Sequence, residues 1–353
     1  MRISGTDSGS SNHGDQRTGP LSARALISGM VGGGAALLAI GFLVLGGHPA
    51  YGAISVHGPE TVADTLAVWE LSGDPDSDDP VERGAYIARI GNCVVCHTAD
   101  PSEETGFLAG GAWIESPFGN FYGTNITPHP EYGIGAWTEE DLVRSLREGR
   151  GPDGAHLYPA FPYTSFTGMT DGDISDLYAF LQAVPPVARE NEDHDIAWFA
   201  SIRLGLAPWK ALNFREWRFE PDPDQDDEWN RGAYLTRAVA HCAECHTPRT
   251  RTGGLVEDLR YAGTEEGADG ESVPNITPHE SGIEDWSQRH LERYLQIGMT
   301  PDGDFAGGSM ADIIAHATSF LTDEDRQAMA RYILSLEPVD NQVEDDSDTG
   351  EPN

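Results

Sequence analysis

The sequence predicts an all-α protein that contains two similar units in tandem. The first observation is an internal duplication, in which "RGAYIARIGNCVVCHT" (83–98) matches "RGAYLTRAVAHCAECHT" (231–247). The second is the local pattern, because short amphipathic segments alternate with long stretches rich in Gly, Pro and Asn. The third is that all four cysteines fall in two copies of Cys-x-x-Cys-His, one in each unit. Together these features predict two small helical domains, at 80–186 and 228–338.

Each unit is expected to contain three helices joined by long loops. The first helix leads into the cysteines. The second begins at Thr138 or Ser287, and both residue types favour the N-cap position. The expected ranges are 83–90 and 231–239 for the first helix, and 138–147 and 287–297 for the second.

The third helix is expected to begin at Thr170 in the first unit and at Thr322 in the second. Asp325 follows Thr322 at the spacing of a capping box. Apolar residues then recur at helical spacing. They are Ile174, Leu177, Tyr178 and Leu181 in the first unit, and Met329, Ile333 and Leu336 in the second. Three short helices around so much loop make a poor hydrophobic core, so something else must fill the middle of each unit.

The chain is strongly acidic, with 22 basic and 58 acidic side chains and a formal net charge of −36. This balance excludes nucleic-acid binding through neutralised phosphates, which needs a basic face. Two interpretations of the charge remain open. It keeps the surface solvated and soluble, or it steers a basic redox partner towards the protein.

Residues 25–47 contain no charged side chain and form the expected membrane anchor. As a helix this segment would rise about 34 Å, which exceeds a hydrocarbon core of roughly 30 Å. Arginines precede it and acidic residues follow, so a single-pass anchor should leave 1–24 in the cytoplasm and export the rest to the periplasm. A cleaved signal peptide ending near "AYG" (50–52) is the alternative. The remaining segments are a linker at 48–79, an interdomain segment at 187–227 and an acidic disordered tail at 339–353.

The repeated Cys-x-x-Cys-His pattern identifies what fills the units. Structural disulfides would not explain the histidine, and a four-thiolate zinc site would need two pairs that lie in separate repeats. The pattern is typical of c-type haem attachment, in which both thiols add to the porphyrin and the histidine ligates the iron. Two covalently bound haem c groups are therefore predicted. The attachment residues are Cys93 and Cys96 with His97, and Cys242 and Cys245 with His246.

The sixth iron ligand differs between the units. In the second unit Met310, expected in a Gly-rich loop ("DFAGGSMADII"), is the predicted ligand, because a thioether is common at electron-transfer haems. The matching position in the first unit is Phe161, which cannot bind iron. Three possibilities stay open there: Met169 as a tentative ligand, His156 as a second imidazole, or an iron with no strong sixth ligand. Met169 could instead simply pack in the core.

Other polar residues carry weaker expectations. The "NITPH" motifs place Asn125 and Asn275 in loops, where turn formation or hydrogen bonds to haem propionates would explain them. His129 and His279 end the same motifs. His241, just before Cys242, is expected to be a polar surface residue. The locally basic and aromatic segment 195–219 is expected to clamp the two domains together, or to serve as a docking face or place cations near the propionates.

The motifs "NITPH", "LYPAFPYTSFT", "CHTPR" and "GGSMA" together resemble the multihaem cytochrome c subunit of membrane-bound bacterial alcohol, gluconate and related dehydrogenases. The resemblance runs from about 80 to 338. It implies tandem class I cytochrome c-like domains, with His97, His246 and Met310 as axial ligands. Many members of this family have three haem domains and a methionine where Phe161 stands, and this chain departs from them in both respects.

The resemblance implies an electron carrier rather than an enzyme. Such a protein would accept electrons from a dehydrogenase subunit and pass them to quinone, a cytochrome or an oxidase. The alternative is a dihaem peroxidase-like enzyme with an open first haem, and a haem-based sensor is a further possibility. The sequence offers no acid–base constellation for peroxide chemistry.

Overall fold

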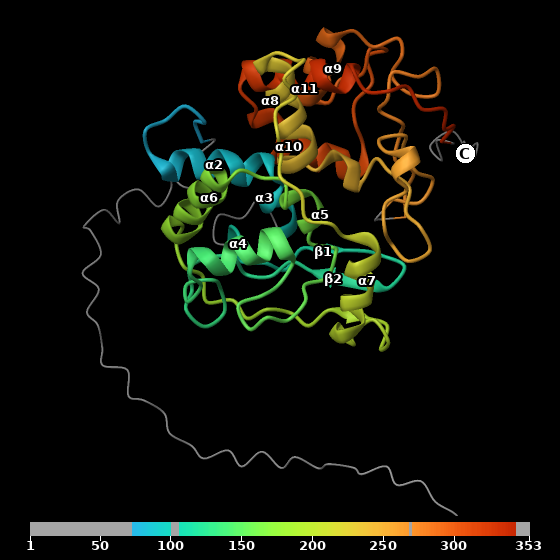
Figure 1. The fold of residues 1–353 in the computed structure, drawn as a ribbon. Coiled ribbons are helices and arrows are strands. Elements are labelled where there is room, and N and C mark those ends of the chain that lie inside the picture. Colours follow the sequence, from blue (N-terminus) through green and yellow to red (C-terminus); the bar gives the residue numbers. More distant parts are fainter. Residues whose placement is uncertain (1–72, 100–105, 268–269, 344–353) are drawn as a thin grey trace, which may run out of the picture. The chain divides into compact units, whose positions relative to one another are not determined.

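The computed structural model describes residues 73–99, 106–267 and 270–343, all of which belong to one compact unit spanning 60–353. The expected anchor at 25–47, the segment 1–24 and most of the linker and tail lie outside the described residues. Among the helices that are described, none has the length and apolar character that a membrane span requires. The described part is mostly helical, as predicted, but it also contains one small sheet, which the all-α prediction did not include (Figure 1).

The first repeat is closed by its two terminal helices. Helix α2 (Pro80–Ile90) lies against α6 (Asp171–Ala183). The two backbones meet at Gly84, where a Cβ would lie 1.9 Å from the carbonyl oxygen of Asp176. Only glycine permits this approach. The elements between them are α3 (Cys93–His97), α4 (Glu139–Glu148) and α5 (Tyr163–Phe166).

The second repeat has the same frame. Helix α8 (Asp227–Tyr234) packs on α11 (Asp323–Leu334), and a Cβ at Gly232 would lie 1.9 Å from the carbonyl oxygen of Ala328. Gly232 is the counterpart of Gly84, so the helix crossing is duplicated with the sequence. The other elements are a π-helical turn η4 (Leu235–Val239), 3-10 turns η5 (Cys242–Glu244), η6 (Glu257–Leu259) and η7 (Thr318–Phe320), and helices α9 (Gln288–Ile297) and α10 (Gly308–His316).

The π-helical turn η4 has a cause that is visible in the sequence. Gly91 lies eight positions after Arg83, but its counterpart Ala240 lies nine positions after Arg231, so the second repeat carries one extra residue before its cysteines. The N–H of Ala240 donates to the carbonyl of Leu235, five residues earlier, at 2.7 Å. A π turn accommodates one inserted residue without disturbing the helix on either side. The start of α8 and the cysteines therefore keep the relationship they have in the first repeat.

The predicted starts of the second and third helices are confirmed, whereas α2 and α8 begin three and four residues before the expected Arg83 and Arg231. Thr138 and Ser287 cap α4 and α9, and each forms a complete capping box with the third residue of its helix. Thr170 and Thr322 cap α6 and α11 through their side chains.

The expected capping box at Thr322 and Asp325 forms only in part. The Thr322 hydroxyl accepts from the N–H of Asp325 at 3.1 Å, but the N–H of Thr322 donates to the hydroxyl of Tyr86 instead of the Asp325 carboxylate. That carboxylate accepts from Tyr86 and Arg231. A partner from the other repeat has therefore replaced one half of the local motif.

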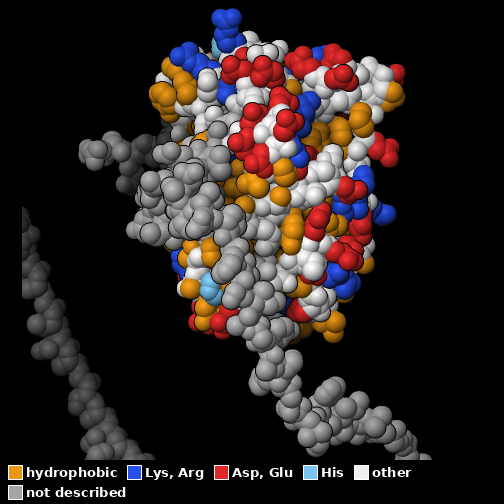
Figure 2. All heavy atoms as spheres, turned by 90° about the vertical axis from the view of Figure 1, so that its left-hand side faces the viewer, with side chains coloured by type: hydrophobic (Ala, Val, Ile, Leu, Met, Phe, Trp, Pro, Cys, Tyr) orange, Lys and Arg blue, Asp and Glu red, His pale blue; other side chains and the backbone are white. Residues whose placement is uncertain are grey.

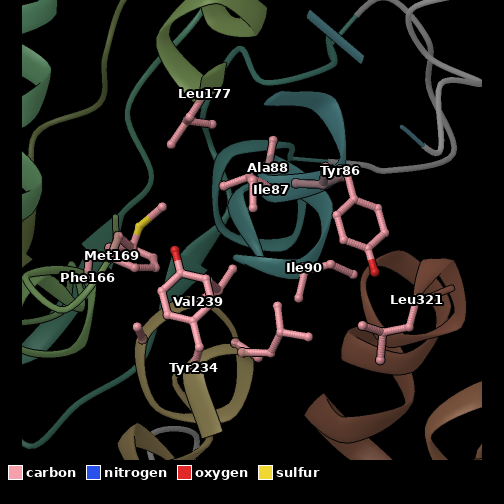
Figure 3. Close-up of a cluster of buried hydrophobic side chains, with 14 of the residues drawn as sticks. Tyr86, Ile87, Ala88, Ile90, Phe166, Met169, Leu177, Tyr234, Val239 and Leu321 are labelled. Atoms are coloured by element: carbon pink, nitrogen blue, oxygen red, sulfur yellow. The ribbon is translucent and has the colours of Figure 1, made fainter. Parts of the chain in front are cut away.

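The repeats meet in a shared hydrophobic core. The same buried cluster contains residues from α2 and α6 and from α8, η4 and α11. Figure 3 shows Tyr86 from α2 and Tyr234 from α8 within it, with Ile90, Val239 and Leu321 beside them. The two tyrosines are counterparts in the duplication. Both repeats therefore contribute equivalent side chains to the same core.

A small antiparallel sheet, not foreseen in the sequence, holds the segment between the repeats. Strands β1 (Trp113–Ile114), β2 (Gly119–Tyr122) and β3 (Asp195–Ile196) pair in that order. Trp113 lies opposite Tyr122, and Gly119 lies opposite Ile196. The strands are too short to show alternation, and β3 lies far from the hairpin in sequence, so no local pattern could reveal the sheet.

The segment 195–219 contacts both repeats, as the clamp interpretation predicts. It contains a 3-10 turn η3 (Arg203–Gly205) and helix α7 (Leu206–Asn213). In α7, Trp209 donates to the carbonyl of Thr252 in the second repeat at 2.6 Å, and the ammonium of Lys210 donates to that of Gly149 in the first at 2.6 Å. Other apolar side chains of the segment remain open to solvent, with Trp198 78% and Leu204 79% exposed.

Acidic side chains are spread over the described surface. Figure 2 shows one face of the molecule, on which Asp and Glu occur together with smaller apolar areas and scattered basic groups. The ion pairs of Arg83 with Asp176 and of Arg331 with Asp226 lie at or near the surface. Exposed pairs of this kind contribute little to stability.

Candidate functional site

The two predicted haem-ligating histidines have the same orientation. Nδ1 of His97 lies 2.6 Å from the carbonyl oxygen of Thr124, and Nδ1 of His246 lies 2.8 Å from that of Pro274. A carbonyl oxygen can only accept, so Nδ1 carries the proton in both rings. Nε2 is then the free lone pair for a metal. Ligating histidines are usually oriented by such a bond from the other nitrogen.

A left-handed residue precedes each attachment turn. Asn92 has a φ of 59° and His241 a φ of 42°. Asn and His are among the few side chains that adopt this region readily. Each therefore lets the chain turn sharply from the first helix into the cysteines.

The residue after each histidine anchors a second loop. The hydroxyl of Thr98 accepts from the N–H of Leu108 at 3.1 Å, and that of Thr247 accepts from Tyr261 at 3.0 Å. Both threonines are 1% exposed. The repetition of Cys-His-Thr in both units is the sequence signal for this pair, which was not among the predicted site residues.

The side chains of the four cysteines are half-buried, and none of them forms a disulfide. Burial raises the pKa of Cys93 and of Cys242 to about 12, and that of Cys96 to about 11. The apo chain therefore keeps these thiols protonated at neutral pH. Among the described residues, no three His, Cys, Asp or Glu side chains come close enough to hold a metal ion together. The geometry thus offers no four-thiolate zinc site there.

Met310 does not lie in a loop as expected. It is in the first turn of α10 (Gly308–His316) and is half-buried. The Gly307-Gly308 pair made the stretch look irregular, but α10 begins within it. Helix α10 lies beside α3 of the first repeat, so the segment that carries Met310 contacts the other attachment turn.

The candidates for the first sixth ligand lie in different environments. Met169 is 2% exposed and packs in the shared core beside Phe166, as Figure 3 shows. His156 is half-buried, and its Nδ1 is buried without a hydrogen-bond partner. Burial is the main cause that lowers the pKa of His156, with Lys210 and Arg150 adding to it. Phe161, at the position of Met310, has its ring 5.6 Å from that of Phe166.

The asparagines of the "NITPH" motifs form turns. The side-chain oxygens of Asn125 and Asn275 accept from the N–H groups of Thr127 and Thr277, at 3.0 and 2.8 Å. Their amide groups donate to carbonyls beyond the last helix, at Val187 and Val339. Each is 2% exposed. Hydrogen bonds within the protein thus engage the oxygen and the amide nitrogen of both asparagine side chains. This supports the turn interpretation over hydrogen bonds to haem propionates.

The histidines that end these motifs stabilise the same loops. Nδ1 of His129 accepts from the N–H of Tyr132 at 3.1 Å, and Nδ1 of His279 accepts from that of Ser281 at 3.2 Å.

The expectation for His241 is wrong. Its ring is half-buried at the junction of the repeats, in an edge-to-face contact with Phe166 at 5.3 Å. Its Nε2 lies 3.4 Å from the carbonyl oxygen of Gly91, just before the first attachment motif. Distant segments create this environment, so the sequence around His241 could not show it.

The described residues fit covalently bound haem c. Each motif places two cysteine thiols close in sequence to an imidazole whose Nδ1 is held by a backbone carbonyl, which leaves Nε2 as the nitrogen for a metal. The thiols would attach the porphyrin, and His97 and His246 would ligate iron. Once bound, haem c supplies reversible one-electron chemistry.

Comparison with known proteins gives a consistent result. A family model described as cytochrome c matches residues 230–337. A protein named "Diheme cytochrome c-type" from Cereibacter sphaeroides is 41% identical over 261 residues, which cover 73% of this chain and 86% of that protein.

Two similar proteins are subunits of dehydrogenases. The cytochrome c subunit of a quinone alcohol dehydrogenase from Gluconobacter oxydans is 39% identical over 75% of this chain and 56% of its own length. The fructose dehydrogenase cytochrome subunit of Gluconobacter japonicus is 40% identical over 72% of this chain and 52% of its own length. The chain therefore matches little more than half of these two relatives.

Proposed function

Because the chain belongs to the family of dihaem and dehydrogenase-associated c-type cytochromes, we propose that it takes electrons from a dehydrogenase and carries them on two haem c groups, one in each repeat. The observation that carries the proposal is the doubled orientation of His97 and His246 by the carbonyls of Thr124 and Pro274. One such site would indicate one redox centre. Two related sites in one compact unit favour a short relay of electrons between two haems.

The chain's own residues have defined roles in this proposal. The thiols of each motif would hold the porphyrin, and each histidine would ligate its iron. Met310 would be a further ligand of the second iron, where a thioether would favour the reduced state and raise the potential. At the first iron, Met169 and His156 remain the candidates, and an iron without a strong sixth ligand remains the third possibility.

The cellular setting belongs to the same proposal. Residues 25–47 would anchor the chain as a single transmembrane helix, with the haem domains in the periplasm. The downstream acceptor would be quinone, a cytochrome or an oxidase. The names of the relatives support a dehydrogenase as the donor.

A redox titration followed by optical and EPR spectra tests the proposal. Protein matured in an export-competent host should carry two thioether-bound haems, and both should titrate as one-electron centres. A mass equal to the bare polypeptide would refute it. Rapid peroxide turnover by the isolated protein would favour the peroxidase-like alternative.

A further inference from the structure

Glu244 is a buried carboxylate inside the second attachment motif. It occupies the position just before the second cysteine, where the first motif has Val95. Its side chain is only 9% exposed. Burial of a carboxylate is costly unless hydrogen bonds and opposite charge compensate, so its partners indicate its purpose.

The partners of Glu244 come from both repeats. Its Oε1 accepts from the hydroxyls of Thr164 and Ser165, the latter at 2.9 Å, and both residues lie in α5 of the first repeat. Its Oε2 accepts from the guanidinium of Arg249 at 2.8 Å. The carboxylate therefore ties the second attachment turn to a helix of the first repeat.

Helix α5 directly follows the stretch in which the sixth ligand of the first iron is expected. It begins two residues after Phe161, the position that matches Met310. The indole N–H of Trp217 also restrains this helix by donating to the carbonyl of Thr164 at 3.1 Å. Glu244 thus supplies a side-chain restraint on the segment that follows the expected sixth-ligand position of the first iron.

We propose that Glu244, although part of the second attachment motif, is a positioning residue for the first haem site and lowers the potentials of both haems through its charge. This inference rests on the proposed function, because it assumes that both motifs hold haem. The proposal has a structural part and an electrostatic part. The hydrogen bonds to α5 position the first site, and the buried negative charge acts on both irons.

The direction of the electrostatic effect follows from the charges. A nearby carboxylate stabilises the ferric state more than the ferrous state, and burial preserves this interaction from screening. Arg249 compensates only in part, because its side chain is 39% exposed and its charge is screened by water. Loss of the Glu244 charge should therefore raise both potentials.

Two substitutions of Glu244 separate charge from positioning. Glu244→Gln removes the charge but keeps an oxygen that accepts from α5, so both midpoint potentials should rise while the first haem keeps its EPR signature. Glu244→Val, which copies Val95, also removes the bonds. It should raise both potentials, alter the EPR signature of the first haem and increase the fraction of that haem that binds carbon monoxide. A Met310→Ala variant assigns the signals to each haem.

Glu257→Gln is the matched control. It removes the same charge from the same repeat at a site whose side chain is 70% exposed. It should leave both potentials and both EPR signatures unchanged. An equal rise in the control, or wild-type potentials in Glu244→Val, would overturn the inference.

A second variant protects the test from a folding failure at the motif itself. Thr164→Val combined with Ser165→Ala removes the two donors from α5 and leaves the attachment motif intact. It should alter the EPR signature of the first haem alone, and an unchanged signature would refute the positioning role. Absence of haem from the wild type would instead refute the proposed function, so the two failures remain distinct.

Discussion

The hydroxyl of Tyr86 donates a hydrogen bond to the carboxylate of Asp325 at 2.7 Å, across 239 residues of sequence. The counterpart of Tyr86 in the second repeat, Tyr234, donates to Asp173, the counterpart of Asp325 in the first. Each repeat therefore supplies a tyrosine from its first helix to the cap of the other repeat's last helix. This reciprocal exchange fixes the arrangement of the two candidate haem sites.

Replacement of Tyr86 by Phe should destabilise the protein by about 1.5–3 kcal/mol, the usual contribution of a hydrogen bond to a charged group. Burial raises the pKa of Tyr86, so its hydroxyl remains a donor at neutral pH. Asp325 keeps its bond to Arg231 in the variant, which limits the loss. Urea unfolding measures the change.

Tyr178→Phe is the control for that measurement. The Tyr178 hydroxyl donates to the carbonyl of Trp137 within one repeat at 3.0 Å, a neutral bond that contributes about 0.5–1.5 kcal/mol. Equal losses of unfolding free energy in the two variants would show that the Tyr86–Asp325 bond between the repeats contributes no more than a neutral bond within one repeat.

The sequence specified the local elements well and the contacts between repeats poorly. Thr138 and Ser287 revealed two helix starts because an N-cap is a local signal. Asp325 gave a misleading signal. Its spacing from Thr322 fits a capping box, but its carboxylate accepts a hydrogen bond from Tyr86 instead. His241 and Glu244 gave no signal, since their partners lie in another repeat.

Glycines misled the prediction for Met310 for a different reason. A pair of glycines usually marks a loop, yet Gly308 is the first residue of α10 and has a φ of 52°. The attachment sites were predictable because covalent haem attachment needs a fixed local spacing. The sheet was not, because β3 reaches it from the segment between the repeats.

Deletion of Ala238 should leave haem attachment intact. The deletion gives the second repeat the same spacing from Arg231 to Cys242 as the first has from Arg83 to Cys93. The π-helical turn would then become a regular helix. Haem content, measured by pyridine haemochrome absorbance and intact mass, should match that of the wild type.

Deletion of Ala88 from α2 is the counterpart experiment. The first repeat has no inserted residue to lose, so the cysteines would rotate by about 100° relative to the start of the helix. Attachment at the first motif should fail, which leaves one haem per chain. Loss of haem in the Ala238 deletion would contradict the insertion argument.

Stability should depend on pH through Lys210, the only lysine of the chain. Burial lowers the pKa of its ammonium to about 8, below the value of about 10.4 in an unfolded chain. Between these two values the unfolded state binds more protons than the native state, so stability conferred through this group rises with pH. Below pH 8 the ammonium is charged in both states, and the dependence vanishes.

A Lys210→Met variant isolates this contribution. Thermal midpoints of wild type and variant should diverge as the pH is raised from 8 to 10, with the wild type gaining relative to the variant. A constant difference over that range would show that the ammonium keeps its ordinary pKa in the folded protein.

Met310→Ala should lower the potential of one haem and open that haem to carbon monoxide. The reason is that loss of a thioether removes the ligand that favours ferrous iron and leaves a vacant coordination position.

Met329→Leu is the control, because Met329 is fully buried in the core and a volume-conserving change there costs little. The control should leave both potentials and carbon monoxide binding unchanged. If Met310→Ala binds no more carbon monoxide than the control, Met310 is not the sixth ligand. Parallel measurements on Met169→Leu and His156→Gln then identify the ligand at the first site. If the first haem binds carbon monoxide in one of these variants, the replaced residue is its sixth ligand. No change in either variant indicates an iron without a strong sixth ligand.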